Sequence, residues 1–176
     1  MKARRLYLLV SAAVIVLDQI TKQIVEAKLP LHSSREIVPG LASLTHVRNR
    51  GAAFGFLSNA ELPYQSVLFS ALSFLALAAI AIYAFRLPAA QRWTQMALAL
   101  IMGGAVGNLI DRIAHGHVID FVDVYWKTHH WPAFNVADSC ISIGVVMLIL
   151  ELLWPHPSPS HAAKGAAALS MFRPGD

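Results

Sequence analysis

Residues 6–27 read LYLLVSAAVIVLDQITKQIVEA, an apolar stretch that carries an aspartate and a lysine in its second half. A helix needs about 20 apolar residues to cross a hydrocarbon core of about 30 Å, because it rises about 1.5 Å per residue. This stretch is long enough, and no small-x-small cleavage site closes it as in a removable signal peptide. We therefore expect it to be a retained first transmembrane helix.

Three more apolar stretches of similar length follow at 65–85, 93–113 and 133–154. The composition agrees with a membrane protein: 56% of the 176 residues are hydrophobic and 14% are charged. A soluble domain has about 45–50% and about 25%, respectively. We predict an all-α integral membrane protein with four transmembrane helices and a small extracytoplasmic β-rich loop subdomain.

The four spans form one expected domain, residues 1–154, and they place both termini on one side of the membrane. Basic residues before the first span and around the short second loop favour a cytoplasmic location for that side. These residues are Lys2, Arg4, Arg5, Arg86 and Arg92. Other basic residues then lie outside, namely Lys28, Arg35, Arg48, Arg50, Arg112 and Lys127. The tail 155–176 is rich in Pro, Ser and Ala, which is typical of a disordered, here cytoplasmic, segment.

The two longer connections are expected on the outer side. Residues 28–64 contain strand-like pieces at 36–39 and 41–47, although their alternation is imperfect. Residues 114–132 carry aromatic side chains suited to the membrane interface. The isoelectric point of about 9.5 does not indicate nucleic-acid binding, because the basic residues form no continuous surface. Anionic lipid headgroups account for the positive charge.

Ionisable side chains inside the spans are costly in a bilayer and need a reason. In the first span Asp18 and Lys22 are four residues apart and share one helix face. The third span ends with Asn108, Asp111 and Arg112 on one face, and the fourth begins with Asn135 and Asp138 on one face. With alternating span directions these three groups reach the same depth. We predict a single site in the outer leaflet.

Structural interpretations compete with functional ones at several of these positions. Asp18 and Lys22 are typical of a structural ion pair, and Asp111 with Arg112 of a local charge network. Gly103 and Gly107 form a G-x-x-x-G pattern that indicates close helix packing. The segment at 49–55, NRGAAFG, is consistent with a turn or with close approach to a ligand. Asp123 is expected to be solvated.

Two neighbouring carboxylates cannot both ionise cheaply, so they share a proton and can activate water for peptide hydrolysis. Asp120, just before the fourth span, and Asp138, in its first turn, are plausible partners. His115, His117, His129 and His130 form no H-E-x-x-H helix, so no metal is assigned. Cys140 is the single cysteine and lacks a nearby histidine on its helix, which favours a small buried residue.

Five blocks together resemble the lipoprotein signal peptidase (signal peptidase II) family, in order and over residues 5–154. They read DQITK at 18–22, NRGAAFG at 49–55, GNLIDR at 107–112, VIDF at 118–121 and FNVADS at 134–139. The resemblance implies an intramembrane aspartyl endopeptidase without a cofactor or metal. It also implies a globomycin-sensitive enzyme of the inner membrane. Such enzymes remove signal peptides from prolipoproteins just before a diacylglyceryl-modified cysteine.

The resemblance also implies roles for individual residues. Asp120 and Asp138 match the catalytic pair of the family. The residues that match substrate-binding or supporting positions are Asp18, Lys22, Asn49, Gly51, Asn108, Asp111, Arg112, Asn135 and Ala137. The expected partners are a diacylglyceryl-modified prolipoprotein, membrane lipids and globomycin-type inhibitors, with a monomeric enzyme and no nucleic acid.

Two other classes of protein fit the same residues. A small ion-coupled transporter or channel would use Asp18, Asp111 and Asp138 as a cation path. A non-catalytic assembly protein would tolerate Asp→Asn changes at both positions of the pair. Loss of prolipoprotein processing on such changes distinguishes the peptidase from both alternatives.

Overall fold

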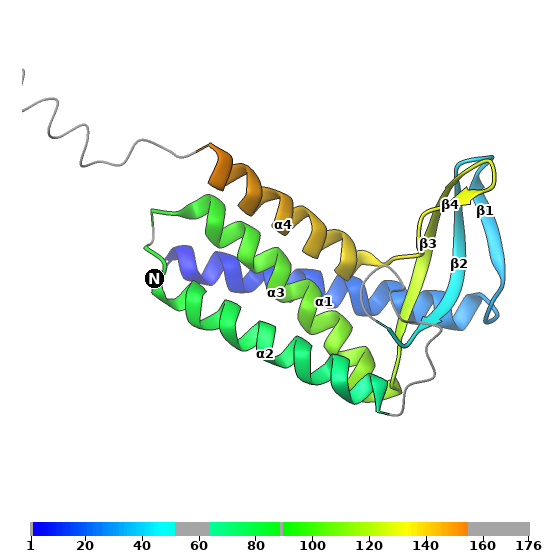
Figure 1. Cartoon of the computed structure of the whole chain (residues 1–176), viewed down its shortest axis with the longest axis horizontal. Coiled ribbons are helices and arrows are strands. Elements are labelled where there is room, and N and C mark those ends of the chain that lie inside the picture. The colour runs from blue at the N-terminus through cyan, green and yellow to red at the C-terminus, as the bar shows by residue number, and fades with distance from the viewer. Residues whose placement is uncertain (1, 52–63, 89, 155–176) are drawn as a thin grey trace, which may run out of the picture.

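The protein was analysed as a computed structural model, which describes residues 2–51, 64–88 and 90–154. The expected tail at 155–176 and the part of the NRGAAFG block after Gly51 lie outside these residues. Within them the chain forms four long helices and a small antiparallel sheet at one end of the helices (Figure 1).

The four predicted spans are confirmed as helices. They are α1 (Lys2–Lys28), α2 (Gln65–Arg86), α3 (Arg92–His115) and α4 (Val136–Leu153). Each is long and apolar enough to cross a membrane. The fourth begins three residues later than the predicted 133, because Asn135 caps it: the Asn135 side chain accepts a hydrogen bond of 2.9 Å from the Asp138 amide. Asp138 therefore lies in the first turn, as predicted.

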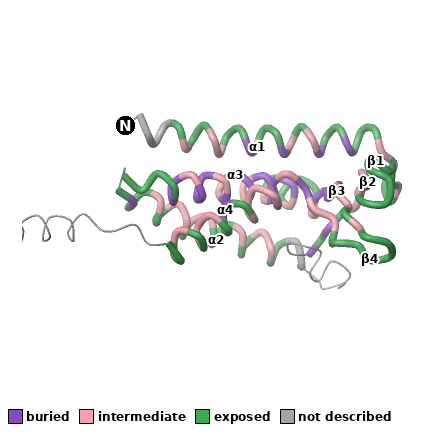
Figure 2. The backbone as a smooth tube through the Cα atoms, turned by 90° about the horizontal axis from the view of Figure 1, so that it is seen from above, coloured by how far each residue is buried: buried purple, intermediate pink, exposed green. Residues whose placement is uncertain are grey.

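Helix α3 is the centre of the bundle, and α1, α2 and α4 pack around it. Half of the apolar window of α3 is buried, whereas none of that of α2 is. Figure 2 shows the same contrast, with buried residues concentrated along α3. Apolar side chains on the outer faces need no burial in protein, because lipid is as apolar as they are.

The G-x-x-x-G pattern of α3 brings α1 close, as predicted. A Cβ atom at Gly103 would lie 2.8 Å from the Val14 Cβ, and one at Gly107 would lie 2.5 Å from an Asp18 carboxylate oxygen. Neither gap admits a methyl group. The two glycines thus set the distance at which α1 presents Asp18 to α3.

We expect Gly107→Ala to lower the free energy of unfolding by about 1–3 kcal/mol, the usual cost of overpacking. It should also reduce activity, because the added methyl group displaces the Asp18 carboxylate. Thermal unfolding in detergent and a peptidase assay measure the two effects. Gly103→Ala is the matched control: it crowds Val14 instead and should lose stability while keeping most activity. Equal activity losses in the two variants would contradict this assignment.

The sheet has the strand order β1-β2-β3-β4. Strands β1 (Ser34–Val38) and β2 (Ala42–Asn49) confirm the two strand-like pieces predicted in the first connection. Strands β3 (Val118–Trp126) and β4 (His129–His130) lie in the second connection, where the sequence predicts interfacial aromatic side chains but no strand. The all-α description is therefore corrected to four helices plus a small antiparallel sheet.

The pattern of burial explains why β3 escapes prediction. Its first four residues, Val118 to Phe121, are all buried, so the strand lacks the alternation of a half-exposed strand. Ile119 and Phe121 pack in one cluster with Val25 of α1. The amides of Phe121 and Val122 donate to the Phe134 carbonyl at 3.0 and 2.8 Å. Strand β3 is thereby held beside the end of α1 and the start of α4.

Candidate active site

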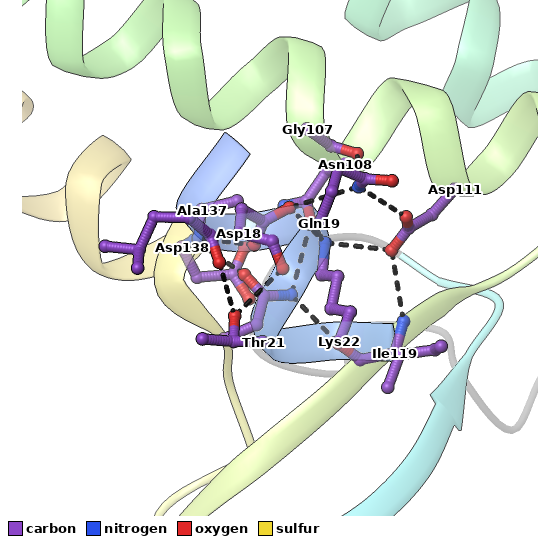
Figure 3. Close-up of polar contacts among 12 residues, drawn as sticks. Asp18, Gln19, Thr21, Lys22, Gly107, Asn108, Asp111, Ile119, Ala137 and Asp138 are labelled. Atoms are coloured by element: carbon purple, nitrogen blue, oxygen red, sulfur yellow. Dashed lines mark hydrogen bonds and ion pairs between the residues drawn. The ribbon is translucent and has the colours of Figure 1, made fainter. Parts of the chain in front are cut away.

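Lys22 is the centre of a buried network between α1 and α3, and it is 2% exposed. Its Nζ lies 2.8 Å from Asp18 Oδ2, 2.8 Å from Asp111 Oδ2 and 2.9 Å from Asn108 Oδ1. An ammonium group has three donors, and all three are used. The predicted Asp18–Lys22 pair is confirmed, and its surroundings are drawn in Figure 3.

The partner of Asp111 differs from the one predicted. Asp111 forms its ion pair with Lys22 of α1, although Arg112 is adjacent to it in sequence. Arg112 instead donates from Nη2 to the Gly51 carbonyl at 3.0 Å, so it holds the end of β2 against α3. The network is therefore a connection between helices and not a local pair on α3.

Asp18 also connects α1 to α4. Its Oδ1 accepts a hydrogen bond of 2.9 Å from the backbone amide of Ala137. The first amides of a helix have no partner within the helix and favour an anion. Ala137 therefore contributes to the site through its main chain, and its side chain is buried completely.

Asp120 and Asp138 come from different elements and meet around Asn135. Asn135 Nδ2 donates to Asp120 Oδ1 at 2.8 Å, while Asn135 Oδ1 accepts from the Asp138 amide at 2.9 Å. Asn135 is 0% exposed, and both aspartates are buried. The asparagine that caps α4 thus holds both the Asp120 carboxylate and the backbone of Asp138.

Two further amides complete the contacts of the carboxylates. Asn49 Nδ2, at the end of β2, donates to Asp120 Oδ2 at 2.9 Å. Asn108 Nδ2 of α3 donates to Asp138 Oδ1 at 2.8 Å. Since Asn108 also accepts from Lys22, it joins the Lys22 network to Asp138. Each carboxylate is held by amide groups that carry no charge of their own.

Burial raises the pKa of Asp120 from 3.8 to about 7, and the nearby negative charge of Asp138 adds to the rise. The hydrogen bonds from Asn49 and Asn135 act in the opposite direction. A carboxyl group with this pKa is still substantially protonated near neutral pH. Two buried carboxyl groups that influence one another in this way can share one proton.

The Asn49 block begins as a turn, which agrees with the structural interpretation of its sequence. The Gly51 amide donates to Asn49 Oδ1 at 2.8 Å, a local side-chain turn that holds the amide group of Asn49 toward Asp120. Asn49 and Gly51 are thus both brought to the site, Asn49 by contact with a carboxylate and Gly51 by contact with Arg112.

Gln19 belongs to the network, although its role was missed in the sequence. Its Nε2 donates to Asp111 Oδ1 at 2.8 Å and to the Gly107 carbonyl at 3.2 Å. Gln19 and Lys22 are three residues apart and so share a helix face. This three-residue spacing is the sequence feature that could have identified Gln19 as part of the network.

Asp123 lies away from the pair. An odd separation along a strand turns side chains to opposite faces, so Asp123 does not face the site of Asp120. Its carboxylate lies 3.0 Å from His130 Nδ1 and is 17% exposed, which makes it more enclosed than the solvated residue expected.

Over residues 2–51, 64–88 and 90–154, no three His, Cys, Asp or Glu side chains are grouped to hold a metal ion. Cys140 is half-buried on α4.

The sequence matches the model of a known family. Residues 10–154 match the family model described as Signal peptidase (SPase) II. The chain belongs to the signal peptidase II family. It is therefore a membrane peptidase, as the five sequence blocks implied.

Individual relatives of this signal peptidase II chain are similar over most of their length. A lipoprotein signal peptidase of Geobacter metallireducens is 53% identical over 149 residues, which are 85% of this chain and 91% of the relative. That of Geobacter sulfurreducens is 50% identical over 79% of this chain and 86% of the relative.

Solved structures agree on the fold of the signal peptidase II chain. A bacterial membrane enzyme determined by the in meso method at 2.3 Å resolution has a TM-score of 0.73 and 35% identity, with 84% of this chain and 87% of that one covered. A second, at 1.9 Å, has a TM-score of 0.75 and 32% identity, with 85% and 94% covered.

Proposed function

We propose that this peptidase removes signal peptides from prolipoproteins with Asp120 and Asp138 as its catalytic pair, cutting just before a diacylglyceryl-modified cysteine. The observation that carries the proposal is the convergence of two buried aspartates on one asparagine. Asn135 contacts the Asp120 carboxylate at 2.8 Å and the Asp138 amide at 2.9 Å. Such a pair performs hydrolysis without a covalent intermediate.

The chemistry balances with one proton on the pair. The ionised aspartate takes a proton from water, whose oxygen attacks the carbonyl carbon of the scissile peptide bond. The protonated aspartate gives its proton to the carbonyl oxygen, which yields a tetrahedral diol. The carbon–nitrogen bond then breaks as a proton passes to the leaving amine, and the products are a carboxylic acid and an amine.

Within the pair we place the shared proton mainly on Asp120. Asp138 lies in the first turn of α4, where free amides and the macrodipole favour an anion by about 0.3–1 kcal/mol. Asp120 lies on strand β3 and has a pKa raised to about 7 by burial and by Asp138. Asp120 is then the acid that protonates the carbonyl, and Asp138 the base that activates water.

This assignment sets the pH dependence of the reaction. Above a pH of about 7 Asp120 loses its proton, so both carboxylates are ionised and the acid is missing. We expect kcat/KM, which reports ionisation in the substrate-free enzyme, to fall by about tenfold per pH unit on that alkaline side. A pH–rate profile measures this, and activity that stays constant to about pH 9 would contradict it.

Unfolding of the Asp120→Asn variant supplies a check that does not depend on activity. The folded pKa of Asp120 is above the unfolded value of 3.8, so its contribution to stability is present at low pH and is lost as pH rises toward about 7. Asparagine does not ionise, so Asp120→Asn removes this pH-dependent loss of stability. The variant should be more stable than the parent at about pH 8, and its advantage should vanish near about pH 4.

The outer-leaflet location also remains part of the proposal. The sheet lies at the end of the bundle opposite to the basic residues Arg86 and Arg92 of the short second loop (Figure 1). Positive charge favours the cytoplasmic side. Exposed Trp126 and Trp131 near the sheet suit the interface on the other side. A lipidated cysteine anchored in the outer leaflet would then lie level with the carboxylates.

The deciding experiment incubates the purified protein with a diacylglyceryl-modified prolipoprotein and with the same prolipoprotein lacking the lipid. Mass spectrometry should show cleavage of the lipidated form directly before the modified cysteine, and globomycin should inhibit it. Cleavage at another position, or equal cleavage of both forms, would contradict the proposed specificity.

Activity should survive strong chelators and thiol alkylation. Neither the histidines of the second connection nor Cys140 has a role in the proposed mechanism, so we expect more than about half of the rate to remain with either reagent. The lipidated-prolipoprotein assay measures this. A loss that chelator causes and added zinc restores would overturn the carboxylate mechanism.

A further inference from the structure

A groove of about 100 Å³ lies between α1 and α2, with α3 as its floor. Tyr7 and Ser11 line it from α1, Ala84 and Phe85 from α2, and Gln95 from α3. It is far from the carboxylates: Ser11 precedes Asp18 by seven residues and Gln95 precedes Asn108 by thirteen. These separations are about 10 and about 20 Å along a helix. The groove therefore lies in the half of the bundle away from the carboxylates, and it reaches Met102 near the middle of α3.

Gln95 gives this groove a specific polar feature. The residue is 8% exposed, and its side-chain Nε2 donates to the Pro88 carbonyl at 2.8 Å. That bond fixes the orientation of the Gln95 amide group. The Pro88 carbonyl can accept only from an N–H, so Nε2 must face Pro88 and Oε1 must lie on the other side of the amide. Among the described residues Oε1 has no hydrogen-bond partner. A buried acceptor of this kind is costly unless a ligand donates to it.

The charges around the groove select the class of ligand. Arg86 follows the lining residue Phe85, and Arg92 lies one helical turn before Gln95; both are exposed. Among the described residues, Glu151 is the acidic side chain at this end of the bundle. It accepts a hydrogen bond from Thr94, on the side where α3 packs against α4. Basic clefts between spanning helices bind anionic lipid headgroups, at about 1 kcal/mol per basic residue near the surface.

A signal peptide is a poorer occupant for the same reason. Its leading segment is positively charged and would lie beside Arg86 and Arg92. A phospholipid, in contrast, brings an acyl chain for the apolar walls, a phosphate for the arginines and, in some headgroups, hydroxyl donors. Each of the three parts then meets a complementary part of the groove.

We propose that this groove binds an anionic glycerophospholipid with a hydroxyl-bearing headgroup. One acyl chain lies between α1 and α2, the phosphate lies near Arg86 and Arg92, and a headgroup hydroxyl donates to Gln95 Oε1. The site is separate from the catalytic pair and does not depend on the proposed peptidase mechanism.

Native mass spectrometry of the full chain in detergent tests this with three lipids of identical acyl chains. Phosphatidylglycerol is anionic and has hydroxyl donors, phosphatidylmethanol is anionic without them, and phosphatidylcholine is zwitterionic. We expect retention to decrease in that order. The hydroxyl should account for about two- to tenfold in apparent affinity, the usual range for one hydrogen bond.

Three substitutions locate the binding. Ala84→Phe fills the groove from α2 and should abolish retention of all three lipids above background. Ala79→Phe adds the same side chain to an exposed position of α2 and should change nothing. Gln95→Leu keeps the size of the side chain but removes the acceptor, and should make phosphatidylglycerol and phosphatidylmethanol bind equally.

The outcomes separate the proposal from its rivals. Equal retention of the three lipids by the parent, or retention by Ala84→Phe at the level of Ala79→Phe, would overturn it. An Ala84→Phe variant that keeps its lipid but shows a raised KM for prolipoprotein would assign the groove to the signal peptide instead. If Ala84→Phe fails to fold, Gln95→Leu decides: an unchanged preference for phosphatidylglycerol would refute the proposed contact.

Discussion

Asp120→Asn and Asp138→Asn are each expected to abolish cleavage of a lipidated prolipoprotein. General acid–base groups contribute about 10²–10⁴-fold to a rate, and either substitution removes one member of the pair. The loss should appear in kcat, because the carboxylates act on the reacting atoms and contribute little to holding the lipid and the signal helix. Single-turnover assays with purified variants measure it.

Asp123→Asn is the matched control for this result. It removes a carboxylate from the same strand, but from the side where Asp123 pairs with His130 at 3.0 Å. We expect it to keep most of the activity. Circular dichroism and thermal unfolding must show that all three variants are folded in detergent. An inactive Asp123→Asn together with an active Asp120→Asn would show that the wrong aspartate of β3 has been assigned.

Lys22→Met should be the most destabilising of the substitutions considered. Lys22 Nζ lies 2.8 Å from both Asp18 and Asp111, and all three side chains are buried. Removing one partner of a buried ion pair costs about 3–5 kcal/mol, because the remaining charge is left without compensation. Here two carboxylates are left, so we expect a loss at the upper end of that range by thermal unfolding in detergent.

Lys28→Met tests whether the position of the lysine matters. Lys28 lies at the exposed end of α1, so its loss should change stability by less than about 0.5 kcal/mol. Adding Asp18→Asn to Lys22→Met should restore part of the stability, because one of the two uncompensated charges is then absent. No recovery in the double variant, or a Lys22→Met protein as stable as Lys28→Met, would argue against a structural role for the ion pairs.

The sequence by itself determined the four helices and the fact that the polar groups of three of them lie at one common level. A spanning helix is defined by one local property, an apolar run long enough for the bilayer, and all four runs became helices within a few residues of the predicted ends. That common level followed from the same rise per residue. The sequence could also indicate that Asn135 belongs to the start of a helix, because helix capping depends only on residues that are neighbours in the chain.

The tertiary structure decided which groups are partners. Asp111 binds Lys22 of α1 and not its neighbour Arg112, because the approach of α1 to Gly103 and Gly107 decides which side chains face one another. Likewise, the sequence did not predict strand β3, because burial on both faces of a strand removes the apolar–polar alternation by which a strand is recognised. Pairing across elements is a long-range property: Asn135 lies 15 residues from Asp120 in sequence and 2.8 Å from it in space. Local sequence patterns do not predict such distances, because these distances are set only when the helices pack.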